Sequence, residues 1–230
     1  MSEARERILA AIRHSLHRSR LGAAAEAELR SRLAAPRRNP IPERATRLDR
    51  EQRIELFTAM AEEVNATVSR VSSLATVPEA VAQYLTAANV PADIVMAPDT
   101  SLDVIPWQSW PLLRIRRGRA VADDKVSLTP CLAAIAETGT LMLGSGPATP
   151  TTLNFLPDTH IVILRADQVV ATYEEGWQQL RGNEDPLPRV VNFITGPSRT
   201  ADIEQHIELG AHGPRRLHIV LVGDGEATGK

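Results

Sequence analysis

The sequence predicts an α/β fold, in which a mostly parallel central sheet is covered by helices. Two observations support this class. Short apolar runs typical of buried strands recur along the chain, and segments with helical periodicity lie between them. In addition, a chain of 230 residues, 43% of them apolar, is long enough to bury one substantial core. We therefore expect one α/β domain, preceded by a helical arm.

The predicted arm occupies the N-terminal part of the chain. Its first helix carries apolar residues on one face, at Ile8, Leu9, Ile12 and Leu16. Residues 23–33 continue in helix-favouring types, and three prolines within residues 36–42 then favour an extended linker. The predicted organisation is an arm with its linker over residues 1–42, a domain over 43–224 and a flexible tail over 225–230.

Helices of the domain are predicted from caps and periodicity. Asp49 and Gln52 form a capping box before an apolar helical face, and Thr76 and Glu79 form a second one. A third helix is expected over 173–180, with Trp177 facing inward. Strands are expected over residues 67–71, 93–97, 112–115, 160–164, 190–194 and 217–222.

The first candidate site is the polar segment 195–213, which lies between the last two predicted strands. Ser198 or Thr200 is predicted to cap a short helix over residues 201–209. The backbone N–H groups of that helix would accept a carboxylate or phosphate, and Arg199 would clamp it with two hydrogen bonds. The alternative is a capped turn whose polar groups satisfy one another.

The second candidate site is the Glu-Thr-Gly-Thr break at 137–140, which separates two apolar runs. A carboxylate held between buried runs can act as a base, a nucleophile or a ligand. Thr138 and Thr140 are placed to hydrogen-bond to Glu137. The alternative is that Glu137 only caps the turn.

Composition argues against several classes of function. The net charge of −2 gives no support to a general binder of nucleic acid or of membrane surfaces. Cys131 is the only cysteine, so the sequence predicts neither a disulfide within the chain nor a metal site. The N-terminus lacks the apolar core of a signal peptide, and no apolar run is long enough to span a bilayer. We therefore expect a cytoplasmic protein.

Several motifs occur together in a recognisable order. They are Ala-Glu-Thr-Gly-Thr at 136–140, Leu-Pro at 156–157, Thr-Gly-Pro-Ser-Arg-Thr-Ala-Asp-Ile-Glu at 195–204, His-Gly-Pro at 212–214 and Leu-His-Ile-Val-Leu at 217–221. From about residue 50 to Gly223 the chain resembles the LUD-domain family, in particular its lactate utilisation protein C type (LutC/YkgG). One difference concerns an Arg that related chains often place before the Leu-Pro pair. If that Arg contacts an anion, Asn154 or Thr152 must replace it here, or the contact is absent.

The resemblance implies a three-layer domain like those of the NagB/RpiA/CoA-transferase superfamily. It also implies a part in oxidising L-lactate to pyruvate, together with two iron–sulfur partner proteins. One thiol cannot hold a four-thiolate cluster, so iron–sulfur clusters are expected in the partners and no cofactor is expected in this chain. The sequence leaves open whether the chain is itself an enzyme. The alternatives are a CoA-transferase-like enzyme with Glu137 as nucleophile, and a module that senses a small carboxylate.

We expect the candidate residues to converge on one pocket for a small carboxylate or phosphate. Polar residues that follow apolar runs should lie at strand ends, and open α/β sheets bind ligands outside the carboxyl ends of their strands. The predicted site comprises Glu137 as the catalytic candidate, with Thr138, Thr140, Ser198, Arg199, Thr200 and His212 as ligand-binding residues.

Overall fold

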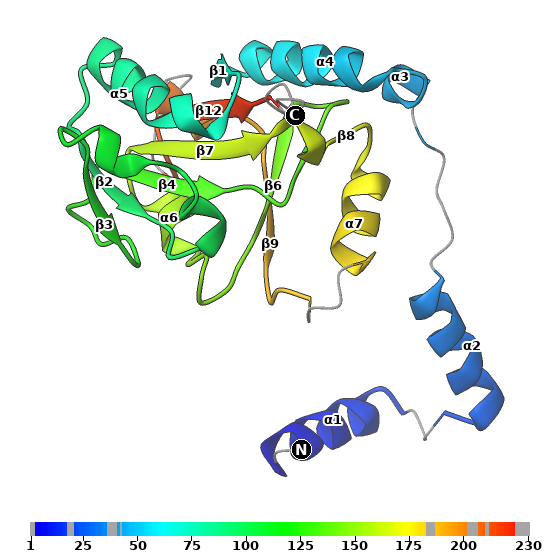
Figure 1. The fold of residues 1–230 in the computed structure, drawn as a ribbon. Coiled ribbons are helices and arrows are strands. Elements are labelled where there is room, and N and C mark those ends of the chain that lie inside the picture. The colour runs from blue at the N-terminus through cyan, green and yellow to red at the C-terminus, as the bar shows by residue number, and fades with distance from the viewer. Residues whose placement is uncertain are drawn as a thin grey trace. The chain divides into compact units, whose positions relative to one another are not determined.

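A six-stranded parallel sheet is the centre of the computed structural model (Figure 1). The structure describes residues 3–17, 21–35, 41, 43–182, 187–201, 207–209 and 212–223. The chain divides into two compact units, Met1–Pro40 and Ile41–Lys230. Most of the predicted linker, and the predicted tail over 225–230, lie outside the described residues.

The first unit contains two helices, as the sequence predicts. They are α1 (Glu3–Ser15) and α2 (Ala23–Ala34), and neither buries a residue. The predicted apolar face of α1 is therefore on the surface, where Ile8 is 59% and Leu16 is 58% exposed.

The parallel sheet has the strand order β1-β12-β7-β4-β2-β3. All its neighbouring strands run in parallel. The strands are β1 (Thr67–Val71), β2 (Asp93–Met96), β3 (Arg114–Arg117), β4 (Val126–Pro130), β7 (Thr159–Arg165) and β12 (Arg216–Val222). The α/β class, the mostly parallel sheet and the N-terminal helical arm are thus confirmed, while the superfamily name stays a prediction.

A second sheet, which the sequence analysis did not predict, covers one face of the parallel sheet. Its order is β8-β5-β6-β9, and β6 runs antiparallel to both of its neighbours. The strands are β5 (Ala133–Ile135), β6 (Thr140–Gly144), β8 (Val169–Val170) and β9 (Val191–Ile194). Alternate residues of β6 serve two cores. Leu141 and Leu143 pack toward the parallel sheet, whereas Met142 packs with Leu180 of α7.

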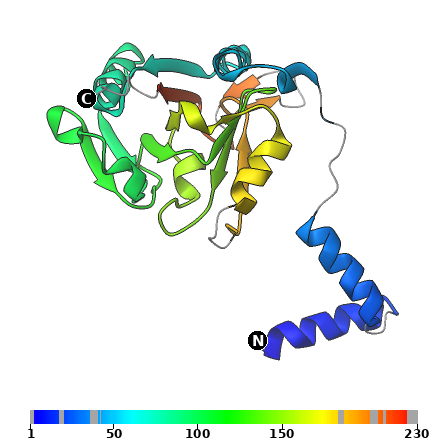
Figure 2. The ribbon, with the colours of Figure 1, turned by 45° about the vertical axis from the view of Figure 1, so that its right-hand side comes forward.

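Helices complete the packing of the second unit. The longer ones are α4 (Arg50–Glu63), α5 (Val77–Ala87) and α7 (Tyr173–Gly182), and the short ones are α3 (Glu43–Thr46) and α6 (Thr152–Phe155). Short 3-10 turns lie at Leu74–Thr76, Thr100–Leu102, Trp107–Ser109 and Ala166–Gln168. Figure 1 shows α4 and α5 on either side of β1, and both helices contact that strand. Helix α7 and strand β3 lie on opposite sides of this unit (Figures 1 and 2).

One of the two predicted capping boxes forms. At the start of α4, Gln52 N donates to Asp49 Oδ1 at 2.9 Å, and Asp49 N donates to Gln52 Oε1 at 3.0 Å. The box predicted at Thr76 and Glu79 is wrong. Thr76 ends a 3-10 turn in a helical conformation, and its hydroxyl donates backward to Ser73 O at 3.0 Å. Its side chain makes no capping hydrogen bond to the first turn of α5.

The helix predicted over residues 201–209 is also wrong. The described residues there form an antiparallel pair, β10 (Arg199–Ala201) and β11 (Ile207–Leu209), in which Thr200 lies opposite Glu208. The pair begins as an extended segment because Ser198 N donates to Pro214 O at 2.8 Å. That bond ties residue 198 to the chain before β12. The described residues of this segment therefore contain no helix whose amino end could bind an anion.

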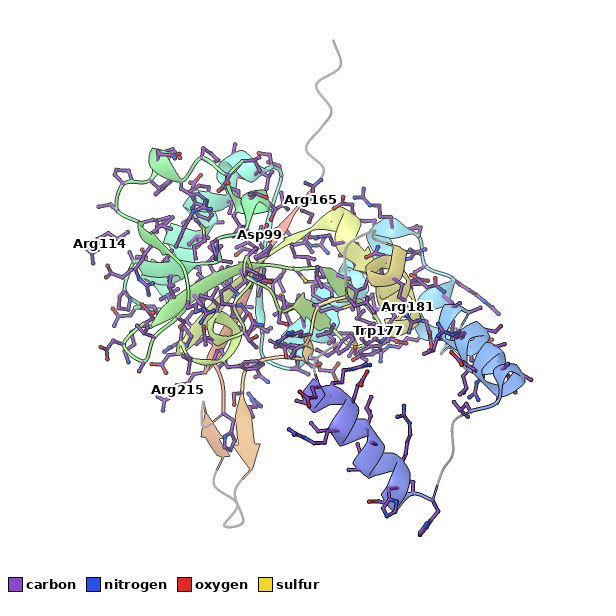
Figure 3. All side chains as sticks on the ribbon, turned by 90° about the horizontal axis from the view of Figure 1, so that it is seen from below. Asp99, Arg114, Arg165, Trp177, Arg181 and Arg215 are labelled. Atoms are coloured by element: carbon purple, nitrogen blue, oxygen red, sulfur yellow. The ribbon has the colours of Figure 1, made fainter. Side chains whose placement is uncertain are left out.

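Strand β3 is an exposed edge of the parallel sheet, and its arginines form ion pairs across that edge. Arg114 Nη2 lies 2.5 Å from Asp93 Oδ2, and Arg116 Nη2 lies 2.6 Å from Asp124 Oδ2. Figure 3 shows Arg114 at the outer margin of the molecule. Charged side chains on an edge strand oppose pairing with another chain. We therefore interpret these arginines as edge protection.

Substitution of Gly139 tests how tightly the second sheet docks against α4. Gly139 has φ of +64°, and a Cβ there would lie 2.5 Å from Met60 C. Gly139→Ala is expected to lower the free energy of unfolding by about 2–4 kcal/mol, since left-handed backbone and overpacking both cost energy. Gly182→Ala is the control, because no atom lies within 4 Å of its added methyl. Urea unfolding of both variants measures this, and equal stabilities would contradict the proposed close packing.

Candidate functional site

A cavity of about 220 Å³ lies between the amino ends of β7 and β12 and the segment that follows β9. Its floor includes His160, the second residue of β7, and Leu217, the second residue of β12. Its walls come from α6, from residues 195–198 and from residues 212–214. The cavity thus borders the amino ends of two parallel strands, not the carboxyl ends where the site was expected. The carboxyl-end rule does not apply because residues 195–198 follow β9, which belongs to the other sheet.

His160 is the most buried polar side chain of this cavity, with no exposed surface. Its Nε2 lies 2.8 Å from Thr129 Oγ1 on β4. Its Nδ1 is buried and has no hydrogen-bond partner among the described residues. Burial lowers the pKa of His160 to about 3, because the charged ring would lose its hydration. The imidazole is therefore neutral at physiological pH.

Asn154 separates this cavity from a second one. It lines both, is only 4% exposed, and its side chain makes no hydrogen bond with another described residue. The second cavity, of about 300 Å³, lies at the carboxyl end of β4 and also contains Thr129 and Cys131. Cys131 donates to Ala133 O at 2.9 Å, and burial raises the pKa of its thiol to about 12. Thr129 and His160, which bond to each other, thus lie in neighbouring cavities.

A cluster of four hydroxyl groups links the predicted Thr-Gly-Thr motif to the first cavity. Thr140 Oγ1 lies 2.7 Å from Thr138 Oγ1, 3.0 Å from the Tyr173 hydroxyl and 2.6 Å from Thr195 Oγ1. Thr195 in turn lines the cavity. The two candidate segments of the sequence therefore meet in space, through Thr140 and Thr195.

Glu137 lies on the turn between β5 and β6 and is not among the lining residues of either cavity. Its side chain is nearly buried, and its Oε1 accepts from Tyr173 N at 3.2 Å. Tyr173 is the first residue of α7, so the carboxylate provides an acceptor for an N–H group that has no partner within that helix. This contact corresponds to the capping alternative of the sequence analysis. Trp177 and Arg181 lie close together further along α7 (Figure 3).

The remaining candidate residues separate into two groups. Ser198 and His212 both line the first cavity, with Ser198 half-buried and His212 exposed. Arg199 is exposed on β10 and is not a lining residue, and the side chain of Thr200 lies outside the described part of the chain. Asp202 and Glu204, the carboxylates of the same segment, lie outside the described residues.

His160, Asn154 and Thr195 line the cavity but were not among the predicted site residues. The signal for His160 was weak, because a histidine within an apolar strand is typical of a core residue. Asn154 was noted only as a replacement for an arginine of related chains. Its place in the cavity agrees with that idea, since it supplies a neutral polar group at this position.

Among the described residues, no group of three His, Cys, Asp or Glu side chains is arranged to hold a metal ion. The residues present do not fit an iron–sulfur cluster, because the chain has one cysteine and its thiol is buried. Within the same residues, no helix combines the length and apolar character needed to cross a bilayer.

The fold and cavity define an α/β protein with a small cavity of mixed polar and apolar lining between two sheets. A family model for the LUD domain matches residues 54–222, which is more than half of the chain. The chain therefore belongs to the LUD domain family, as its motifs indicated.

Similar proteins carry a common name. A "Lactate utilization protein C" of an Exiguobacterium species is 37% identical over 131 residues, covering 56% of this chain and 56% of that protein. Another, from Deinococcus radiodurans, is 39% identical over 97 residues, covering 42% of this chain and 45% of that protein. The matches thus span about half the length of these relatives. A crystal structure of a DUF162 family protein from Deinococcus radiodurans superposes with a TM-score of 0.57 at 26% identity, covering 76% of this chain and 99% of that chain.

The two buried histidines predict how stability depends on pH. Burial lowers the pKa of His160 to about 3 and the pKa of His218 to about 4, below the value near 6.5 in an unfolded chain. The unfolded state therefore binds more protons below pH 6.5. Stability should be greatest above about pH 6.5 and should fall by about 1.4 kcal/mol per pH unit for each histidine as the pH decreases toward 4.

Urea unfolding between pH 5 and pH 7 measures this dependence. In His160→Gln the slope should be about half that of the unsubstituted protein, because one of the two titrating groups is absent. Identical slopes in the two proteins would show that His160 does not contribute to the pH dependence.

Proposed function

We propose that this chain acts in lactate utilisation, as a non-redox subunit of an iron–sulfur assembly that oxidises L-lactate to pyruvate. In this proposal the chain binds a small carboxylate in the cavity beside His160. The lactate role is supported by family membership and by the names of the relatives. The binding role is supported by one observation above all, namely a small cavity lined by His160, whose buried Nδ1 has no hydrogen-bond partner among the described residues.

The size and lining of the cavity suit a small anion. Its volume of about 220 Å³ is below the roughly 300–1,000 Å³ typical of pockets for drug-sized ligands, which favours a metabolite of few atoms. Ser198 and His212 provide polar groups at the accessible end, where a carboxylate can remain partly hydrated. Arg199 is not one of the ligand-binding residues in this proposal.

Electron transfer is assigned to partner proteins in this proposal. Cys131, the single cysteine, is buried with a raised pKa, so it is a poor thiolate ligand for iron. Two iron–sulfur partner proteins would accept the electrons released from lactate.

The two alternative functions differ in what they require of the structure. A CoA-transferase mechanism needs Glu137 to attack an acyl group, yet its carboxylate bonds to the amino end of α7 and is nearly buried. No observation favours that mechanism. A carboxylate-sensing module would use the same cavity but would not need iron–sulfur partners. Co-purification separates this alternative from the proposed function.

The isolated chain is expected neither to show iron–sulfur absorbance nor to oxidise L-lactate. Affinity purification of the native protein should bring down iron-containing partners, and lactate oxidation should appear only in that assembly. Visible absorbance, iron content and lactate-dependent dye reduction measure this. Lactate turnover by the isolated chain would refute the subunit role, and binding of lactate without any iron-containing partner would favour the sensing module.

Ser198→Ala tests the carboxylate site. Removing one hydrogen bond to a charged ligand group costs about 1.5–3 kcal/mol, so affinity for L-lactate should fall roughly tenfold or more. Ser101→Ala is the matched control, since that hydroxyl lies in the neighbouring cavity and bonds to Asp99. Isothermal titration calorimetry measures the affinity of both variants for L-lactate. Equal affinities would remove Ser198 from the site.

A further inference from the structure

The protonation state of His160 follows from its partner. Thr129 Oγ1 contacts His160 Nε2 at 2.8 Å and has no other hydrogen-bond partner among the described residues. Donation from Thr129 to Nε2 leaves one buried group, Nδ1–H, without a described partner, whereas the opposite direction leaves both Nδ1 and the Thr129 hydroxyl hydrogen without one. The first arrangement is therefore favoured. A neutral imidazole that accepts at Nε2 carries its proton on Nδ1. His160 thus holds a buried N–H donor with no described acceptor.

An unpaired buried donor is costly, by about 1–3 kcal/mol, unless a ligand or water accepts from it. His160 is a lining residue of the cavity, so a ligand that enters the buried end could provide that acceptor. Asn154, buried and without a described side-chain partner, lies in the same cavity. The buried end of the cavity is therefore polar but uncharged.

The solvent exposure of the lining residues decreases from one end of the cavity to the other. Thr195 and His212 are exposed, and Ser198 is half-buried, whereas His160 is fully buried and Asn154 nearly so. A carboxylate keeps more of its hydration at the accessible end, since a desolvated charge needs an opposite charge that the buried end lacks. The buried end is suited to a neutral oxygen.

We propose that His160, assisted by Asn154, recognises the C2 oxygen of a 2-hydroxy or 2-oxo carboxylate whose carboxylate lies at the Ser198 end. His160 is thereby a specificity-determining residue. This role rests on the proposed carboxylate-binding function. An N–H group can donate to either a hydroxyl oxygen or a keto oxygen. The site should therefore bind both L-lactate and pyruvate and should reject propionate, which lacks an oxygen at C2.

Titration of the full-length protein with these three acids tests the proposal. L-Lactate and pyruvate should each bind at least about tenfold more tightly than propionate, because leaving the buried donor unpaired costs about 1.4 kcal/mol or more. Equal affinities for the three acids would overturn the role of His160 while leaving the carboxylate site intact. If none of the acids binds, both the carboxylate site and this inference fail.

Two variants of similar shape separate the nitrogens of His160. In His160→Gln the amide can replace Nε2 beside Thr129 but leaves nothing at the position of Nδ1, so the preference over propionate should fall to less than about twofold. In His160→Asn the amide lies near the position of Nδ1, so more of the preference should remain. Propionate should bind both variants about as it binds the unsubstituted protein. An unchanged preference in His160→Gln would refute the proposal.

A spectroscopic measurement does not depend on the folding of either variant. With ¹⁵N-labelled histidine, the Nδ1 resonance of His160 should report a protonated nitrogen and should shift on adding L-lactate but not propionate. A folded His160 variant is needed only to identify which resonance belongs to His160. An Nδ1 resonance that is unprotonated, or that ignores L-lactate, would contradict the inference even if both variants unfold.

Discussion

Close contact between the second sheet and the carboxyl-terminal end of α4 holds the second unit together. Gly139, in the turn between β5 and β6, and Gly196, just after β9, both have positive φ and both meet α4 where a Cβ would not fit. A Cβ on Gly196 would lie 2.5 Å from Val64 O. Thr140 follows Gly139 in the chain, and Thr195 precedes Gly196. The hydroxyl groups of these two threonines hydrogen-bond to each other. The same contacts therefore position the wall of the cavity.

This docking also explains why polar groups can exist between two apolar sheets. A sheet face covered by helices would exclude a side chain such as His160 or leave it at the surface. Here the hydrogen bond from Thr129 satisfies one nitrogen, and the cavity lies beside the ring. The His160 ring remains neutral because burial depresses its pKa. At its accessible end the site can leave a charged ligand group partly hydrated, and at its buried end it offers uncharged polar groups.

Most of the elements could be predicted because local rules determine them. The Asp49 capping box, the alternation of β1 and the apolar runs of β7 and β12 are all local sequence patterns. The second sheet could not be recognised in the same way, since β5 and β6 are buried on both faces and lack alternation. The helix predicted over residues 201–209 is replaced in the described residues by parts of β10 and β11. The hydrogen bond from Ser198 N to Pro214 O, which sets the start of this pair, joins residues far apart in sequence and is not visible in a local pattern. His160 and Asn154 acquire their role only when α6 and β7 meet, which no local pattern reports.

The burial of Cys131 has a practical consequence. Its thiol is 5% exposed, donates to two backbone carbonyls and has a pKa of about 12, so almost none of it is thiolate at neutral pH. Maleimides and iodoacetamides react with thiolates and should spare it in the folded protein. Because it is the only cysteine of the chain, a cysteine introduced on the surface would carry a fluorophore or spin label at one defined position. Distances from that label to a bound protein could then be measured without first removing a native thiol.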